Sequence, residues 1–331
     1  MDNWQCFCYA YCLLISSIFI SYYNNLFFMK KFILIVIIAS SISAAHACDI
    51  CGCGGSNLYM GMLPDFKSKF IGIRYHYMQY HTQLANDHTQ FSHNYYNTVE
   101  AWTGWNIGRK WQVLGFVPYY YNKQRDDDHA SSKNGLGDIT LLGNYQLMHT
   151  RKTNDRNNTI EQTLWIGAGI KLPTGTFQLN VNDPNTTIAD INAQIGTGST
   201  DFLLNAMHNI RINQFGINTS VNYKINTANR SDYKYGNKLT ANSIAYYRIR
   251  LGKVAIAPNA GAIYEHTQQN SLSKEKVAFT SGYAVSALAG VEFTFNKIAI
   301  GFNLQKPFSQ DYAGGQTTMQ IRGMAHVTLT L

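Results

Sequence analysis

The sequence predicts an all-β protein: a transmembrane, antiparallel, up-and-down β-barrel of about 12 strands, preceded by a short segment rich in cysteine and glycine. Three observations predict this fold. Apolar and polar residues alternate with a period of two, the connections between strands alternate between short and long, and aromatic residues collect near both strand ends. Together these observations are typical of an outer-membrane barrel with a lipid-facing outer face and a polar lumen.

The composition agrees with a β-rich membrane protein. Charged residues make up 14% of the 331 residues, against roughly 25% in a typical soluble domain. The chain contains 22 tyrosines and 26 glycines, which suit a sheet punctuated by turns. Its net charge of +8 is spread along the chain without a block of lysine or arginine, so the sequence argues against a nucleic-acid partner.

The N-terminus predicts export from the cytoplasm. Residues 29–47 have the three parts of a Sec signal peptide: a basic start, an apolar run over 32–44, and a small-x-small cleavage site that leaves Cys48 as the first mature residue. Residues 1–28 precede a signal that is already complete. They are either an over-extended start site or a second membrane segment, and we favour the first because the stretch lacks positive flanks.

The mature chain divides into a Cys/Gly-rich segment, 48–64, and the barrel, 65–331. Within the barrel, each predicted strand has one apolar and one polar face, as where Val327 and Leu329 alternate with His326 and Thr328. A soluble β-sandwich would explain neither the polar second face nor the alternating loop lengths. The predicted strands cover residues 67–81, 96–108, 111–123, 138–149, 161–173, 200–212, 215–226, 238–251, 253–267, 281–295, 297–307 and 318–331.

The connections give the barrel its two ends. Short turns such as "GRKWQ", "RINQFG" and "FNKIA" alternate with long polar loops. Among the connections that should be short turns, only "TRKTNDRNN" is longer than expected. Short turns predict the periplasmic end, so we expect an integral protein of a Gram-negative outer membrane with its N-terminus in the periplasm. The predicted aromatic girdles contain Trp105, Trp111, Phe215, Phe293 and Phe295 at the short-turn end, and Tyr75, Tyr77, Tyr119, Tyr121, Tyr223, Tyr264 and Tyr283 at the other.

The polar face predicts a lumen lined by charged groups. Its basic residues outnumber its acidic residues, which predicts a modest bias toward anionic or polar solutes. The alternative is that these charges pair with one another and hold the lumen shut. The predicted lining residues are Arg74, His76, Arg248, Arg250, Glu292, Arg322 and His326.

Three motifs on the long-loop side, "GLGD", "KLPTG" and "GTGSTD", contribute one inward charge each. By strand parity Asp138, Lys171 and Asp201 lie at a similar height, so we expect a charged cluster at the mouth of the lumen. A brace of the barrel rim, without solute contact, is an equal alternative.

The stretches "NGLGDITLLGNYQL", "GAGIKLPTG" and "GTGSTDFLL" occur in this order. They resemble the family of outer-membrane β-barrel transporters known as meta-pathway phenol-degradation, or MetA-like, proteins. The resemblance is carried by residues 135–205, and the remainder agrees in pattern. It implies an outer-membrane location and the passage of small molecules, including aromatic or apolar ones.

The segment 48–64 offers a second hypothesis. Thiolate and thioether groups favour Cu(I), and thiolates alone suit zinc. Lipidation of Cys48 and a plain structural plug or tether are the alternatives, and we favour the plug or tether. The candidate ligands are Cys48, Cys51, Cys53, Met60 and Met62.

The sequence therefore favours a channel or transporter for small solutes, with an outer-membrane metal-handling protein as the alternative. A lipid hydrolase would need a serine beside a histidine on the outer wall, and His208 has no such neighbour, so we expect no enzyme. The expected partners are outer-membrane lipid, a small solute and the barrel assembly machinery.

Overall fold

The computed structural model describes residues 69–83, 91–126, 130–155, 157–178 and 194–331. The predicted start-site extension, signal peptide and Cys/Gly-rich segment lie outside these residues. Within the described part of the chain, no helix is long and apolar enough to cross a membrane.

The described chain is almost entirely β-strand, with one 3-10 turn, η1, near its end. Its elements are β1 (Phe70–Gln83), β2 (Phe91–Ile107), β3 (Trp111–Asp126), β4 (Ala130–Leu136), β5 (Thr140–Thr153), β6 (Thr159–Lys171), β7 (Asp201–Ile212), β8 (Phe215–Ile225), β9 (Tyr233–Lys234), β10 (Lys238–Tyr247), β11 (Ile249–Leu251), β12 (Val254–Thr267), β13 (Ser271–Leu272), β14 (Glu275–Lys276), β15 (Gly282–Phe295), β16 (Ile298–Tyr312), η1 (Ala313–Gly315) and β17 (Thr317–Thr330).

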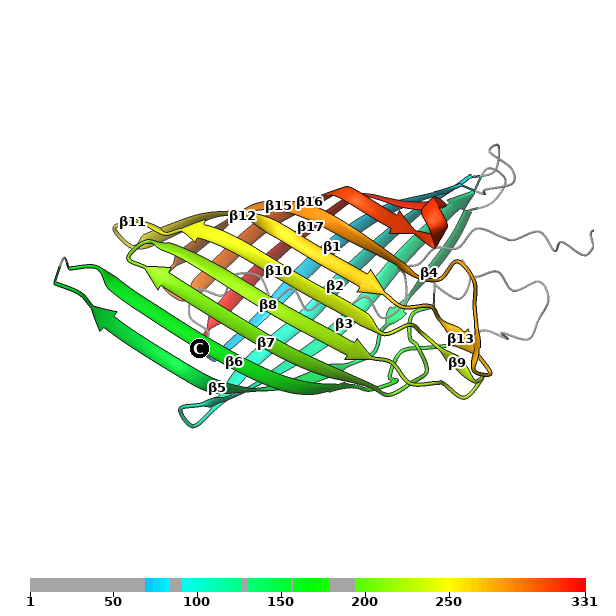
Figure 1. The fold of residues 1–331 in the computed structure, drawn as a ribbon, viewed down its shortest axis with the longest axis horizontal. Helices are drawn as coiled ribbons and strands as arrows, with labels where there is room; N and C mark the ends of the chain where they lie inside the picture. The colour runs from blue at the N-terminus through cyan, green and yellow to red at the C-terminus, as the bar shows by residue number, and fades with distance from the viewer. Residues whose placement is uncertain (1–68, 84–90, 127–129, 156, 179–193) are drawn as a thin grey trace, which may run out of the picture. The chain divides into compact units, whose positions relative to one another are not determined.

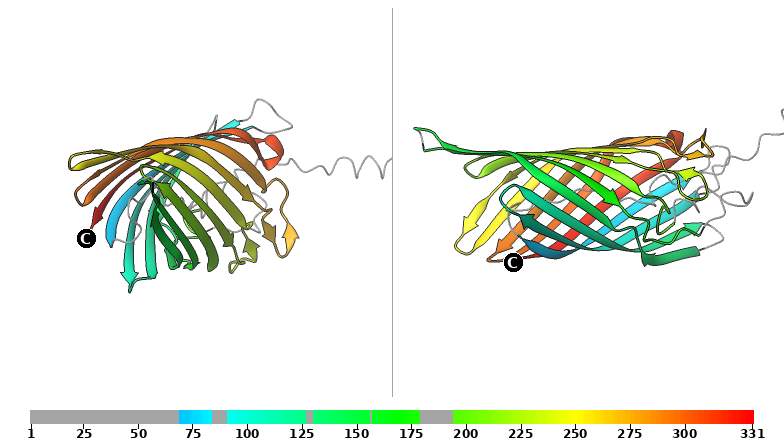
Figure 2. Two further views of the ribbon diagram at one scale, coloured as in Figure 1. Left: turned by 60° about the vertical axis from the view of Figure 1, so that its left-hand side comes forward. Right: turned by 90° about the horizontal axis from the view of Figure 1, so that it is seen from below.

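The large sheet closes on itself, as Figure 1 shows. Wall strands that follow one another in the chain pair antiparallel, and β1 pairs with β17 to complete the circle. The pairs β4–β5 and β10–β11 each form one interrupted wall strand, which leaves twelve strand positions. The prediction of a twelve-stranded up-and-down barrel is therefore confirmed. Figure 2 shows the strands tilted in one sense around the barrel, as closure requires.

The interruption between β4 and β5 is a feature that the sequence did not predict. β4 pairs with the long-loop half of β3 and β5 with its short-turn half, and the ladder breaks at residues 137–139. The polar stretch that forms β4 predicts a loop. In the structure it pairs with the end of β3 nearest the long loops.

The hairpin of β5 and β6 extends beyond its neighbour at the short-turn end (Figure 1). Tyr145 pairs with Trp111, the first residue of β3, and β5 then continues to Thr153. Among the described residues, no strand pairs with this edge of β5 beyond Tyr145. A bulge between Gln146 and Met148 lies at the same place. The first four residues of the unusually long "TRKTNDRNN" connection are thus strand, and β6 begins directly after it at Thr159.

The two faces of the wall are inverted relative to a soluble protein. On β1, the outward-facing Ile71 and Ile73 are 53% and 59% exposed, whereas the inward-facing Arg74 is 2% exposed. A soluble monomer rarely exposes an apolar surface of this extent, and a membrane barrel presents it to lipid. The exposed aromatic side chains near the strand ends include Trp105, Trp111, Phe215, Phe293 and Phe295 at the short-turn end, and Tyr75, Tyr119, Tyr121, Tyr264 and Tyr283 at the long-loop end.

A second, small sheet of β9, β13 and β14 lies in the long loops, where the sequence predicted no strands. Tyr233 and Tyr235 are buried there and pack with Phe177 and Leu272. The long loops on this side are therefore folded against one another at the end of the barrel that carries the charged motifs.

Candidate functional site: the barrel lumen

A charged cluster lies where the sequence expected the lumen mouth. The ammonium Nζ of Lys171 is 2.5 Å from Asp138 Oδ2 and 2.8 Å from Asp201 Oδ2. Lys171 and Asp201 pair across β6 and β7, and Asp138 lies two residues before the β5 residue that pairs with Lys171. All three side chains are buried. The structure thus brings the three predicted residues together.

Loop groups satisfy the carboxylates of this cluster. The backbone N–H groups of Gly175 and Thr197 donate to Asp138 at 2.9 and 3.0 Å. Ser199 Oγ donates to Asp201 Oδ1 at 2.9 Å. The motifs "KLPTG" and "GTGSTD" are therefore fastened to the barrel wall by the same charges, an arrangement that fits a brace of the rim.

The cluster continues around the wall as a charged belt. Lys224 Nζ lies 3.6 Å from Asp201 Oδ2, and Lys224 pairs across β8 and β10 with Lys238. Lys238 Nζ is 3.1 Å from Glu265 Oε1. Three basic groups thus accompany three acidic ones, and Arg322 adds a fourth basic group through Glu265. We call this set the charged belt; it consists of Asp138, Lys171, Asp201, Lys224, Lys238, Glu265 and Arg322.

Arg322 joins the belt from a distant strand. Its Nη1 lies 2.8 Å from Glu265 Oε2 and 3.4 Å from Gln305 Oε1, and its Nη2 lies 3.3 Å from the Tyr80 hydroxyl. Since β15 and β16 separate β17 from β12 in the wall, the two side chains meet inside the barrel. Strand parity identified Arg322 as inward-facing, but this partner depends on the curvature of the wall.

An Arg–Glu pair and a His–Glu pair also lie inside the barrel. Arg74 Nε donates to Glu100 Oε1 at 2.8 Å, and the guanidinium lies 4.5 Å from the centre of the Trp102 ring. His326 Nε2 and Glu292 Oε2 are 3.0 Å apart. The lumen charges are therefore mostly paired, as the alternative interpretation of the lumen expected.

The remaining predicted lining residues differ in their surroundings. His76 follows Arg74 on the inward set of β1 and is half-buried, as is Arg248 between β10 and β11. Arg250 is exposed at the end of β11, next to the short turn. The structure brings none of these three into the charged belt.

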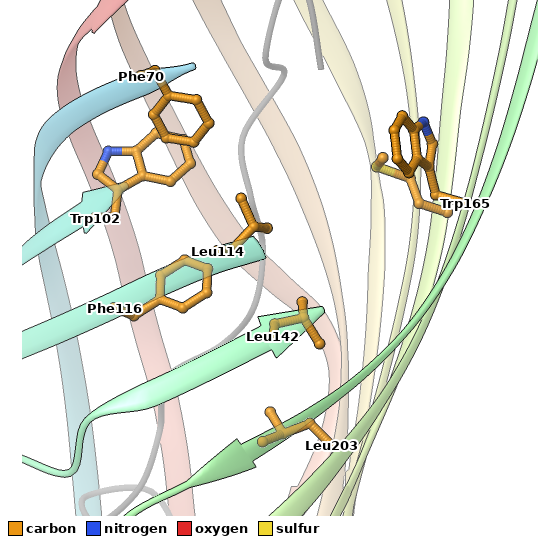
Figure 3. Close-up of a cluster of buried hydrophobic side chains, with 8 residues drawn as sticks. Phe70, Trp102, Leu114, Phe116, Leu142, Trp165 and Leu203 are labelled. Carbon is orange, nitrogen blue, oxygen red and sulfur yellow. The ribbon is translucent and has the colours of Figure 1, made fainter. Parts of the chain in front are cut away.

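An apolar cluster also lines the interior, and sequence parity alone did not identify it. Figure 3 shows its side chains projecting inward from neighbouring strands of one part of the wall. The signal was present in the sequence, because Trp102 shares the face of Glu100. The cluster consists of Phe70, Trp102, Leu114, Phe116, Leu142, Trp165, Leu203 and Met207.

Neutral amides complete the lining. The side chains of Asn122 and Asn144 are buried without a hydrogen-bond partner for either amide atom in the described part of the chain. Buried polar atoms in native proteins are paired with protein or with water. Their amide groups offer hydrogen-bond donors and acceptors to water or to a polar solute. Asn205, Asn222, Asn242, Asn259 and Asn303 each have one further buried amide atom without a hydrogen-bond partner among the described residues.

The described residues contain no group of three or more His, Cys, Asp or Glu side chains arranged to hold a metal ion. The predicted ligands Cys48, Cys51, Cys53, Met60 and Met62 lie outside those residues. Copper or zinc binding by that segment stays a prediction.

Comparisons with known proteins agree with this fold. The family described as "Putative MetA-pathway of phenol degradation" matches residues 77–322. The structure of the COG4313 outer membrane channel from Pseudomonas putida F1 is similar, with a TM-score of 0.55 and 11% identity over 82% of this chain and 100% of that chain. The β domain of the Bordetella autotransporter BrkA has a TM-score of 0.47 and 12% identity over 80% of this chain and 100% of that chain. The curated proteins gave no match to the sequence.

Proposed function

Because the chain belongs to this MetA-pathway phenol-degradation family of outer-membrane β-barrels, we propose that it is an outer-membrane channel that passes small solutes through a narrow, hydrated lumen. The observation that carries the proposal is the set of buried inward amides, such as Asn122 and Asn144, that have no hydrogen-bond partner among the described residues. A lumen built only for stability would be filled with satisfied or apolar side chains. Amides of this kind suit a hydrated lumen, which supports a path for solutes.

The charged belt gives the proposed channel a preference for anionic or polar solutes over cations. It contains four basic groups and three acidic ones, set in a wall whose outer face meets lipid. A low-dielectric wall concentrates the field of such a set, so an excess positive charge raises the local concentration of anions. We propose that small anionic or polar solutes enter in preference to cations. The apolar cluster at the wall adds contact for solutes that also carry an apolar part.

The channel proposal predicts a measurable current. The refolded full-length protein in a planar bilayer should conduct, and under a salt gradient its reversal potential should lie on the anion-selective side. Replacing Lys224 and Lys238 with glutamine should move the reversal potential toward cations, because both ammonium groups line the belt. The double replacement Lys253→Gln/Lys297→Gln is the matched control, since both of these side chains are exposed beside the short turns.

A folded barrel that carries no current and admits no small solute in liposome swelling would overturn the channel proposal. An unchanged reversal potential in the Lys224→Gln/Lys238→Gln variant would overturn the role of the charged belt while leaving the channel intact.

A further inference from the structure

Two histidines face each other on the outer wall of the barrel. His81 on β1 and His93 on β2 are directly opposed cross-strand partners near the long-loop end. Both are half-buried. Their Nδ1 atoms are 3.4 Å apart and their ring centres 4.8 Å apart. Two potential metal-ligand nitrogens therefore converge on one point outside the lumen.

The spacing fits a shared metal ion better than a direct hydrogen bond. N–H groups usually lie about 2.9–3.0 Å from an accepting oxygen, and the two ring nitrogens lie farther apart than that. Zinc binds histidine nitrogen at about 2.0–2.1 Å in tetrahedral geometry, which places two such nitrogens about 3.3–3.4 Å apart. The observed 3.4 Å equals that separation.

The described surroundings hold the two rings. Phe91 packs beside both imidazoles, with ring-centre distances of 5.8 Å to His81 and 5.7 Å to His93. Among the described residues, the two ring nitrogens have no hydrogen-bond partner except each other. Arg125 opposes His93 on β3 and is exposed. Its positive charge favours an anionic group, rather than water alone, in the coordination positions that two histidines leave free.

We propose that His81 and His93 form a two-histidine site for a borderline divalent metal, with zinc as the type case, on the outer wall at the long-loop end. Imidazole suits zinc, copper and nickel alike. Strands fix the two ligands, so the site exists before the ion arrives. It is independent of the lumen and of the proposed channel function.

Calorimetric titration of zinc into the refolded, full-length protein tests the site. The cysteines are alkylated in every sample, so that thiolates do not contribute. The wild type should bind one zinc ion that the His81→Asn/His93→Asn variant does not bind. The control is His266→Asn, since His266 is also half-buried on the outer wall and pairs with Leu239 and Tyr283 rather than with a second histidine. It should retain the zinc ion.

Electron paramagnetic resonance of bound Cu²⁺ gives a second readout, which should report two nitrogen ligands in the wild type and lose them in the double variant. Heat-modifiable migration in gels verifies that each variant is folded. Equal zinc stoichiometry in the wild type and the double variant, absence of zinc binding by the wild type, or an equal loss in His266→Asn would each overturn the proposal.

Discussion

Replacing Lys171 with methionine is expected to lower the free energy of unfolding by about 3–5 kcal/mol, the usual cost of removing one partner from a buried charge pair. Lys171 Nζ lies within 2.8 Å of both Asp138 and Asp201. Its loss removes the cation that forms an ion pair with Asp138, whereas Asp201 keeps Lys224 at 3.6 Å. Urea unfolding in detergent micelles, followed by tryptophan fluorescence, measures the change.

The rescue variant makes this prediction specific. Adding Asp138→Asn to Lys171→Met should recover part of the lost stability, because it removes the buried carboxylate that lost its ion-pair partner. Lys297→Met is the control at an exposed turn position and should stay close to the wild type. If Lys171→Met unfolds at the same urea concentration as Lys297→Met, the cluster does not brace the barrel.

Replacing Gly301 with alanine is expected to destabilise the barrel by about 1–3 kcal/mol, the usual cost of inserting a methyl group into packed space. Gly301 lies on β16 between Glu292 on β15 and His326 on β17, and all three are register partners. A Cβ at this position would lie 2.2 Å from both Glu292 Oε2 and His326 Nε2. The pair can therefore approach to 3.0 Å only because the residue between them has no side chain.

Gly323→Ala is the matched control for Gly301→Ala. It lies on the neighbouring strand β17, and its Cβ would meet Leu304 at 3.4 Å, an ordinary contact distance. The same urea experiment should show little change in this control. The cost of Gly301→Ala should also shrink in a background that already carries Glu292→Ala and His326→Ala. Equal midpoints for the two glycine variants would show that the pair does not depend on Gly301.

The wall of the barrel was predictable because the membrane imposes a simple rule on each strand. Alternation along single strands located all twelve wall positions, and the chain order gave their neighbours. β4 escaped this reasoning because most of its residues are polar and it pairs only with the long-loop end of β3. The strands β9, β13 and β14 are too short to show any period.

The lumen was only partly predictable. Parity identified Arg322 and His326 as inward residues, since parity is a property of one strand. Parity cannot reveal that Arg322 meets Glu265, because that contact depends on the curvature and tilt of four strands. The pairing of His81 with His93 depends in the same way on the register of β1 against β2, which the sequence of either strand alone does not determine.

The projecting hairpin of β5 and β6 has a consequence for how the molecule meets others of its kind. An unpaired strand edge is a template on which another chain can add a strand and begin to aggregate. Here the free stretch of β5 carries a bulge and the exposed cations Arg151 and Lys152. Both devices discourage edge-to-edge pairing, because a bulge disrupts the ladder and like charges repel a second copy. The barrel can therefore expose an open edge without polymerising through it.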